Sequence, residues 1–132
     1  MSGLRTIGRS MLAIGGVVAL MAAMPLGGSY FHTELVKSDP AANETLTKSP
    51  RVIRLWFSER VDIPVTSVKL ESAAGAPIAL SPVSRPDTAA LAPIQITVVS
   101  PLANGSYTLN WSTAGKDGHP AKGSYGFVVQ AK

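Results

Sequence analysis

The chain has 132 residues, a length that suits a single domain. It carries twelve Lys and Arg, eight Asp and Glu and no Cys, so disulfide staples and thiolate metal ligands are excluded. The charges alternate along the chain and form no basic block, which argues against nucleic-acid binding.

The amino-terminal segment has the pattern of a secretory signal peptide. Arg5 and Arg9 precede a charge-free run over residues 10–31 that is rich in Met, Ala, Leu, Val and Gly. A transmembrane anchor is the alternative, but the apolar part, residues 11–26, is shorter than the roughly 20 residues that span a bilayer. We therefore predict a removed leader over residues 1–29 and one exported domain over residues 30–132.

The cleavage site decides which residue carries the terminal amine. Gly27 and Ser29 provide small residues at the third-last and last leader positions, and cleavage there leaves Tyr30 first. Cleavage before His32 would put Phe31 at the last leader position, where it fits poorly, so the boundary stays open between 29 and 31. All four Met lie in the leader, and without them and Cys the mature chain lacks soft ligands for Cu(I).

From Val52 onward the pattern is that of short strands separated by turns. Apolar and polar residues alternate, or β-branched and aromatic residues cluster, in several runs, whereas no helical period is convincing. The expected strands are 52–58, 67–71, 78–80, 94–99, 106–113 and 124–130, with long loops at 60–66 and 81–93 and a break at 115–123. We place Trp56 and Trp111 in the core, with Tyr107 and Leu109 sharing the inward face of Trp111. This spacing predicts an all-β sandwich or barrel.

Two histidines, His32 and His119, carry the candidate chemistry. A single His in a β domain is usually a surface residue without a ligand role. His119, however, follows Asp117 by two positions, which places both side chains on one side of an extended segment. Pro120 favours that extended form, although an ordinary Asp-Gly hairpin turn explains the same residues.

His32 lies close to the predicted mature terminus. A terminal amine, imidazoles and a carboxylate together form a nitrogen and oxygen donor set, which in tetragonal geometry suits Cu(II).

Four blocks of the sequence, in order, resemble the CopC family of periplasmic copper-resistance proteins. They are residues 32–42, which begin with His32 and contain Ser-Asp-Pro-Ala-Ala; residues 53–59, which end in Trp-Phe-Ser-Glu; residues 101–111; and residues 117–127, which begin with Asp-Gly-His-Pro. Each block is weak alone, and together they cover essentially the whole mature chain.

The resemblance implies a Greek-key, immunoglobulin-like (cupredoxin-like) β-sandwich with one Cu(II) ion per chain. Its ligands would be His32, through its imidazole and in the family its own amine, with Asp117 and His119; Glu59 aligns with a carboxylate that lies near the metal in some members. The methionine-rich loop of some members is missing here. A Tyr30 terminus would instead put His32 third, an arrangement that chelates Cu(II) through the intervening amides and competes with Asp117 and His119.

The expected function is therefore that of a periplasmic, monomeric copper carrier or buffer, not an enzyme, that presents Cu(II) to an inner-membrane copper transport protein. Two alternatives remain. A pair of His residues with a terminal amine resembles the histidine brace of copper monooxygenases, although Asp117 would occupy an in-plane position that those enzymes keep for a nitrogen ligand or for oxygen chemistry. A metal-free interaction module on an immunoglobulin-like scaffold is the other, because a fold does not fix a function.

Overall fold

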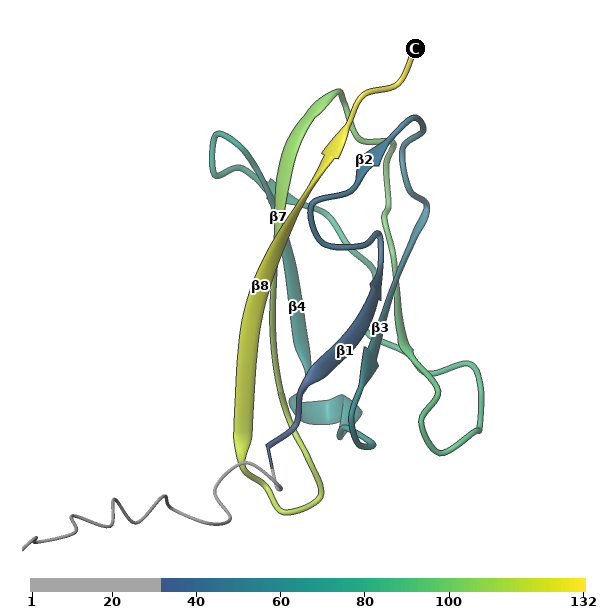
Figure 1. The fold of residues 1–132 in the computed structure, drawn as a ribbon, viewed down its shortest axis with the longest axis vertical. Helices are drawn as coiled ribbons and strands as arrows, with labels where there is room; N and C mark the ends of the chain where they lie inside the picture. The colour runs from purple at the N-terminus through teal and green to yellow at the C-terminus, as the bar shows by residue number, and fades with distance from the viewer. Residues whose placement is uncertain (1–31) are drawn as a thin grey trace, which may run out of the picture.

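The computed structural model describes residues 32–132, which form two β-sheets packed face to face (Figure 1). The predicted leader lies outside the described residues. The smaller sheet has the order β1-β3-β6, from Leu35–Asp39, Val52–Phe57 and Ile94–Thr97. The larger sheet has the order β2-β8-β7-β4-β5, from Thr45–Leu46, Pro120–Val129, Gly105–Ala114, Ser67–Ser72 and Pro77–Ile78. The predicted all-β sandwich is confirmed.

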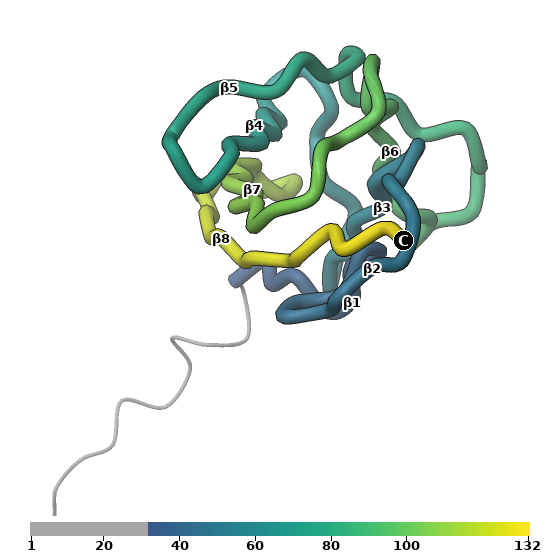
Figure 2. The backbone as a smooth tube through the Cα atoms, turned by 90° about the horizontal axis from the view of Figure 1, so that it is seen from above, coloured from purple at the N-terminus to yellow at the C-terminus, as the bar shows by residue number. Residues whose placement is uncertain are grey.

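The core lies between the sheets and follows from the two-residue period of each strand. Along β3, Ile53, Leu55 and Phe57 are buried while the residues between them are not. On the facing sheet, Tyr107, Leu109, Trp111 and Thr113 of β7 are buried in the same alternating way. Seen from above, β1, β3 and β6 lie on one side of this core and β4, β7 and β8 on the other (Figure 2).

The prediction for one of the two tryptophans was wrong. Trp111 is buried and meets Phe57 edge-on, with ring centroids 5.2 Å apart. Trp56 is only half-buried, because its neighbours Leu55 and Phe57 occupy the inner face of β3 and turn Trp56 outward. There the ammonium group of Lys37 lies 4.5 Å from the centre of the Trp56 ring.

Several predicted boundaries also differ from the structure. The last strand begins at Pro120 instead of residue 124, because ten residues of β8 pair with β7 across a tight turn. The short strand expected at 78–80 is Pro77–Ile78, followed by an isolated bridge between Leu80 and Val98. The loop expected at 60–66 contains a 3-10 helix, η1, over Ile63–Val65. Strands β1 and β2 precede the first strand we predicted.

One end of the sandwich gathers the beginnings and ends of four strands. Strand β1 begins there opposite the end of β3, with Leu35 paired to Phe57, and β7 passes into β8 where Ala114 pairs with Pro120. Figure 1 shows this end at the bottom, together with η1. Within residues 32–132, no helix is long and apolar enough to cross a membrane.

Candidate metal centre

The turn between β7 and β8 brings Asp117 and His119 into direct contact. The carboxylate oxygen Oδ2 of Asp117 lies 2.7 Å from Nδ1 of the His119 ring, and Oδ1 accepts the backbone N–H of His119 at 3.1 Å. Gly118 permits the turn because its φ is +77°, a left-handed conformation that glycine adopts without strain. The two residues therefore meet across a turn, and the extended segment that we predicted here was wrong.

The electrostatics of this pair favour an ionised carboxylate and an accessible imidazole nitrogen. The hydrogen bond from the His119 ring, followed by that from the His119 backbone N–H, lowers the pKa of Asp117 below its ordinary value. The His119 side chain is 74% exposed. Because Nδ1 faces the carboxylate, Nε2 is the ring nitrogen left to accept a metal ion.

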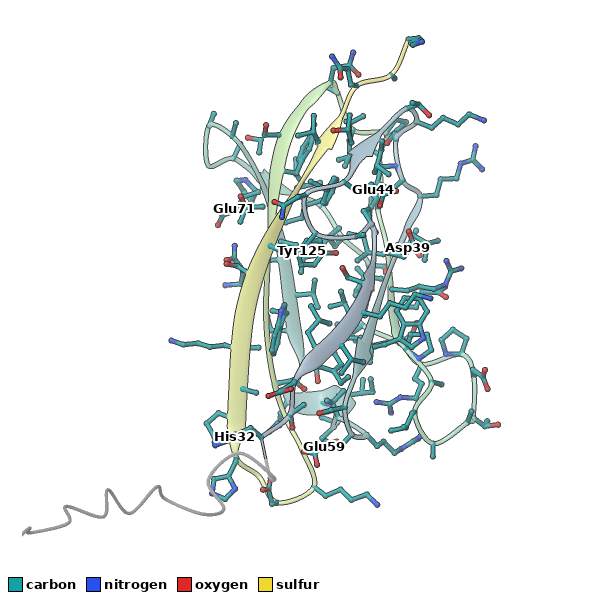
Figure 3. The ribbon with its side chains drawn as sticks, viewed as in Figure 1. His32, Asp39, Glu44, Glu59, Glu71 and Tyr125 are labelled. Carbon is teal, nitrogen blue, oxygen red and sulfur yellow. The ribbon has the colours of Figure 1, made fainter. Side chains whose placement is uncertain are left out.

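His32 lies at the same end of the sandwich as this turn, as does Glu59 (Figure 3). It is exposed and stands three residues before β1. The residues after it are held against the end of β3: the N–H of Ser58 donates to the Glu34 carbonyl at 2.8 Å, and the N–H of Glu34 donates to the Ser58 hydroxyl at 2.9 Å. His32 is thus tethered near the β7–β8 turn by the segment that follows it.

Glu59 links the two segments that carry His32, Asp117 and His119. Its Oε1 accepts a hydrogen bond from the hydroxyl of Thr33, at 2.5 Å, next to His32. The same oxygen lies over Gly115, so close that a Cβ added to Gly115 would come within 1.8 Å of it. Gly115 is two residues before Asp117, so Glu59 packs between the His32 segment and the β7–β8 turn. It is positioned to hold both in place.

Sequence reasoning missed Thr33 and Gly115, both of which are buried at this point. Gly115 continues the two-residue alternation of buried residues that runs through Leu109, Trp111 and Thr113, and this alternation was the available signal for it. Thr33 belongs to no such pattern, and its proximity to Glu59 and Gly115 arises only when β1, β3 and β7 assemble.

The three predicted ligands are brought to one end of the molecule, but only two of them touch. Within the described part of the chain, no three His, Asp or Glu side chains are grouped closely enough to hold a metal ion. The donor set at this end still fits Cu(II) chemically, since it offers two imidazoles and an ionised carboxylate on exposed, adjacent segments. Binding of one ion by all three requires the hydrogen bond between Asp117 and His119 to open and His32 to approach the turn.

Comparison with known proteins points in the same direction. A family model described as the CopC domain matches residues 35–130 and thus begins three residues after His32. Protein YobA of Escherichia coli strain K12 is 33% identical over 103 residues, which cover 75% of this chain and 79% of YobA. Copper resistance protein C of Xanthomonas campestris pv. juglandis is 29% identical over 119 residues, 86% of this chain and 92% of that protein.

Solved structures share the fold. PcoC, a methionine-rich copper resistance protein from Escherichia coli, superposes with a TM-score of 0.66 at 30% identity, over 75% of this chain and 99% of that one. CopC from Methylosinus trichosporium OB3b gives a TM-score of 0.69 at 24% identity, over 76% of this chain and 95% of that one, which shows the similarity of fold alone.

Proposed function

Because the chain belongs to the CopC family of copper resistance proteins, we propose that it binds one Cu(II) ion at the end of the sandwich that carries the β7–β8 turn. The ligands are His32, Asp117 and His119. The protein acts as a carrier or buffer that passes copper to a membrane-bound transport protein, and it catalyses no reaction.

The contact between Asp117 and His119 is the single observation that carries this proposal. The contact holds an oxygen donor and a nitrogen donor together on an exposed turn. Because it occupies Nδ1, the two side chains bind one ion only after this hydrogen bond opens and the imidazole turns. A second imidazole, that of His32, lies at the same end (Figure 3). Such a mixed set suits Cu(II) in tetragonal geometry.

The composition of the chain supports Cu(II) over Cu(I). Soft thiolate and thioether ligands favour Cu(I), yet the chain has no Cys, and its last Met is Met24. PcoC, by contrast, is described as methionine-rich. We infer that the oxidised ion is the one that this chain holds.

The high exposure of the pair supports carriage over permanent retention. An imidazole that is 74% exposed can be approached by a ligand from a second protein, so a bound ion can be exchanged directly. We place this exchange in the periplasm, after removal of the leader. Cleavage after residue 31 would leave the terminal amine on His32, where it adds a nitrogen ligand; cleavage after residue 29 would leave it on Tyr30, where it forms with His32 a chelate that competes with Asp117 and His119.

Copper titration of the secreted, mature protein tests the proposal. Intact mass fixes the first residue, and competition with a chelator of known affinity gives the Cu(II) dissociation constant. We expect one ion per chain and nitrogen hyperfine structure in the electron paramagnetic resonance (EPR) spectrum. His119→Ala and Asp117→Asn should each weaken binding, the former by on the order of a hundredfold or more.

Glu71→Ala is the matched control, since Glu71 lies in β4 toward the other end of the sandwich (Figure 3). Its affinity should equal that of the unmodified protein. Unchanged Cu(II) binding by His119→Ala would refute the proposed site.

A further inference from the structure

A cleft of about 590 Å³ lies directly beside the proposed copper site. One wall is the same β7–β8 turn, which contributes Gly115, Lys116 and Gly118. Asp117 and His119 do not line the cleft. The turn thus has two sides, one with the candidate ligands and one that borders this cleft.

The cleft carries an excess of positive charge. Arg60, Arg85 and Lys116 line it, against the single carboxylate of Asp62. The three cations come from three separate segments: the residues that follow β3, the loop before β6 and the β7–β8 turn. Their convergence on one hollow therefore depends on the tertiary fold.

Arg85 is fixed in the wall of the cleft with part of its hydrogen-bonding capacity unused. Its Nη2 donates to the carbonyl of Val61 at 2.7 Å, while its Nε is buried and has no hydrogen-bond partner among the described residues. Burial, followed by the positive charge of Arg60, lowers the pKa of Arg85, and Asp62 opposes this shift. The guanidinium group of Arg60 also lines the cleft and is exposed, so it can hydrogen-bond to a carboxylate that enters there.

The remaining lining of the cleft is largely apolar. It includes Val61, Ile63, Pro64, Val65 and Ala114, and Val65 is 53% exposed. A surface that combines an apolar wall with guanidinium groups fits a peptide segment containing both acidic and aliphatic side chains. A flat lipid headgroup layer would leave such a hollow unfilled.

We infer that this cleft docks an acidic, partly aliphatic segment of the protein with which the chain exchanges copper, an inference that rests on the proposed function for the identity of that partner. A partner docked there would contact the side of the β7–β8 turn that borders the cleft. Complementary charge would guide the approach and fix the orientation of the two proteins.

Binding of a model peptide to the copper-free protein tests this inference separately from copper chemistry. The probe is a short fluorescein-labelled peptide of alternating Glu and Leu, and the readout is fluorescence anisotropy at low salt. The variant Arg60→Glu/Lys116→Glu replaces two exposed cations of the cleft and leaves the partly buried Arg85 intact. It should bind the peptide at least about tenfold more weakly than the unmodified protein.

The matched control is Lys48→Glu/Arg51→Glu. It makes the same change in net charge at two exposed positions before β3, at the end of the sandwich away from the cleft. Because the change in net charge is the same, any weakening in this control measures the general effect of charge. We expect that weakening to be no more than about twofold. Circular dichroism confirms that both variants are folded.

Three results would overturn the inference: no peptide binding by the unmodified protein, equal weakening in both double variants, or binding to phosphatidylglycerol vesicles in place of the peptide. A Cu(II) titration of the same samples keeps the two proposals apart. Peptide binding without Cu(II) binding would refute the proposed function and the identity of the partner, while the acidic-segment site would stand.

Discussion

The hydroxyl of Thr33 donates a hydrogen bond to the carboxylate of Glu59, and this contact joins the residue next to His32 to the end of β3. The same carboxylate covers Gly115 at the start of the β7–β8 turn. Glu59 therefore lies where the two ligand-bearing segments meet, which suits a residue that positions the ligands.

Thr33→Val tests this positioning role, because it removes the hydroxyl and keeps the shape of a buried side chain. We expect a loss of about 1–2 kcal/mol in the free energy of unfolding, since a partly buried carboxylate loses its donor. Cu(II) affinity should fall by about tenfold, as for other residues that orient ligands. The measurements are urea denaturation and chelator competition.

The EPR spectrum separates positioning from coordination. Thr33→Val and Glu59→Gln should both retain the spectrum of the unmodified protein; a spectrum altered only in Glu59→Gln would make Glu59 a ligand. Thr108→Val, at an exposed position of β7, serves as the control and should change neither stability nor affinity.

Gly115→Ala should destabilise the protein by roughly 1–3 kcal/mol, because the new Cβ would lie 1.8 Å from Glu59 Oε1 and 2.9 Å from Thr33 Oγ1. The Glu59 side chain must move to relieve this overlap. In a Glu59→Ala background the same substitution should therefore cost far less. Equal costs of Gly115→Ala in the two backgrounds, measured by urea denaturation, would contradict the packing described here.

Gly123→Ala should also destabilise, by roughly 1–3 kcal/mol, and should change the tryptophan fluorescence. The added Cβ would approach Cζ2 of Trp111 to 2.6 Å, and the indole ring is held between the sheets. Gly126→Ala on the same strand is the control, since its nearest neighbour is the Tyr107 carbonyl oxygen at 3.4 Å. Similar stabilities for the two variants in thermal denaturation would argue against this contact.

Copper removal should leave the sandwich folded. The buried core lies between the two sheets and contains none of the three proposed ligands. Cu(II) at about 100 times its dissociation constant should add about 2.7 kcal/mol to stability, and EDTA should reverse the gain while the far-ultraviolet circular dichroism stays unchanged. At the same Cu(II) concentration His119→Ala should gain no more than about 0.4 kcal/mol. Unfolding on chelation would contradict a site built on the surface of an independent core.

Alkaline unfolding should depend on Tyr125. Burial raises the pKa of this phenol to about 12, and the carboxylates of Asp39 and Glu44 act in the same direction. Because the folded state favours the neutral phenol, its contribution is complete below about pH 10, the ordinary tyrosine pKa, and is lost as pH rises toward 12. The melting temperature should fall over this interval, and less steeply in Tyr125→Phe. Parallel pH curves would exclude this role for Tyr125.

Much of the fold could be predicted from alternation alone. Strands β3, β4, β6 and β7 lie where β-branched, aromatic and alternating residues occur, because a half-buried strand shows its two faces in its sequence. The sequence pattern did not predict β1, β2 or the first residues of β8. Their residues are largely exposed or small and polar, so only pairing with neighbouring strands makes them strands.

The sequence by itself determined which donors the chain possesses: two imidazoles, an Asp two residues from one of them, and no sulfur ligand after Met24. Only the tertiary structure decided where they lie relative to Glu59, Gly115 and the cationic cleft. The physical reason is that donor chemistry is a property of single side chains. Proximity between residues 33, 59 and 115 instead depends on how the two sheets pack and on the register of their strands.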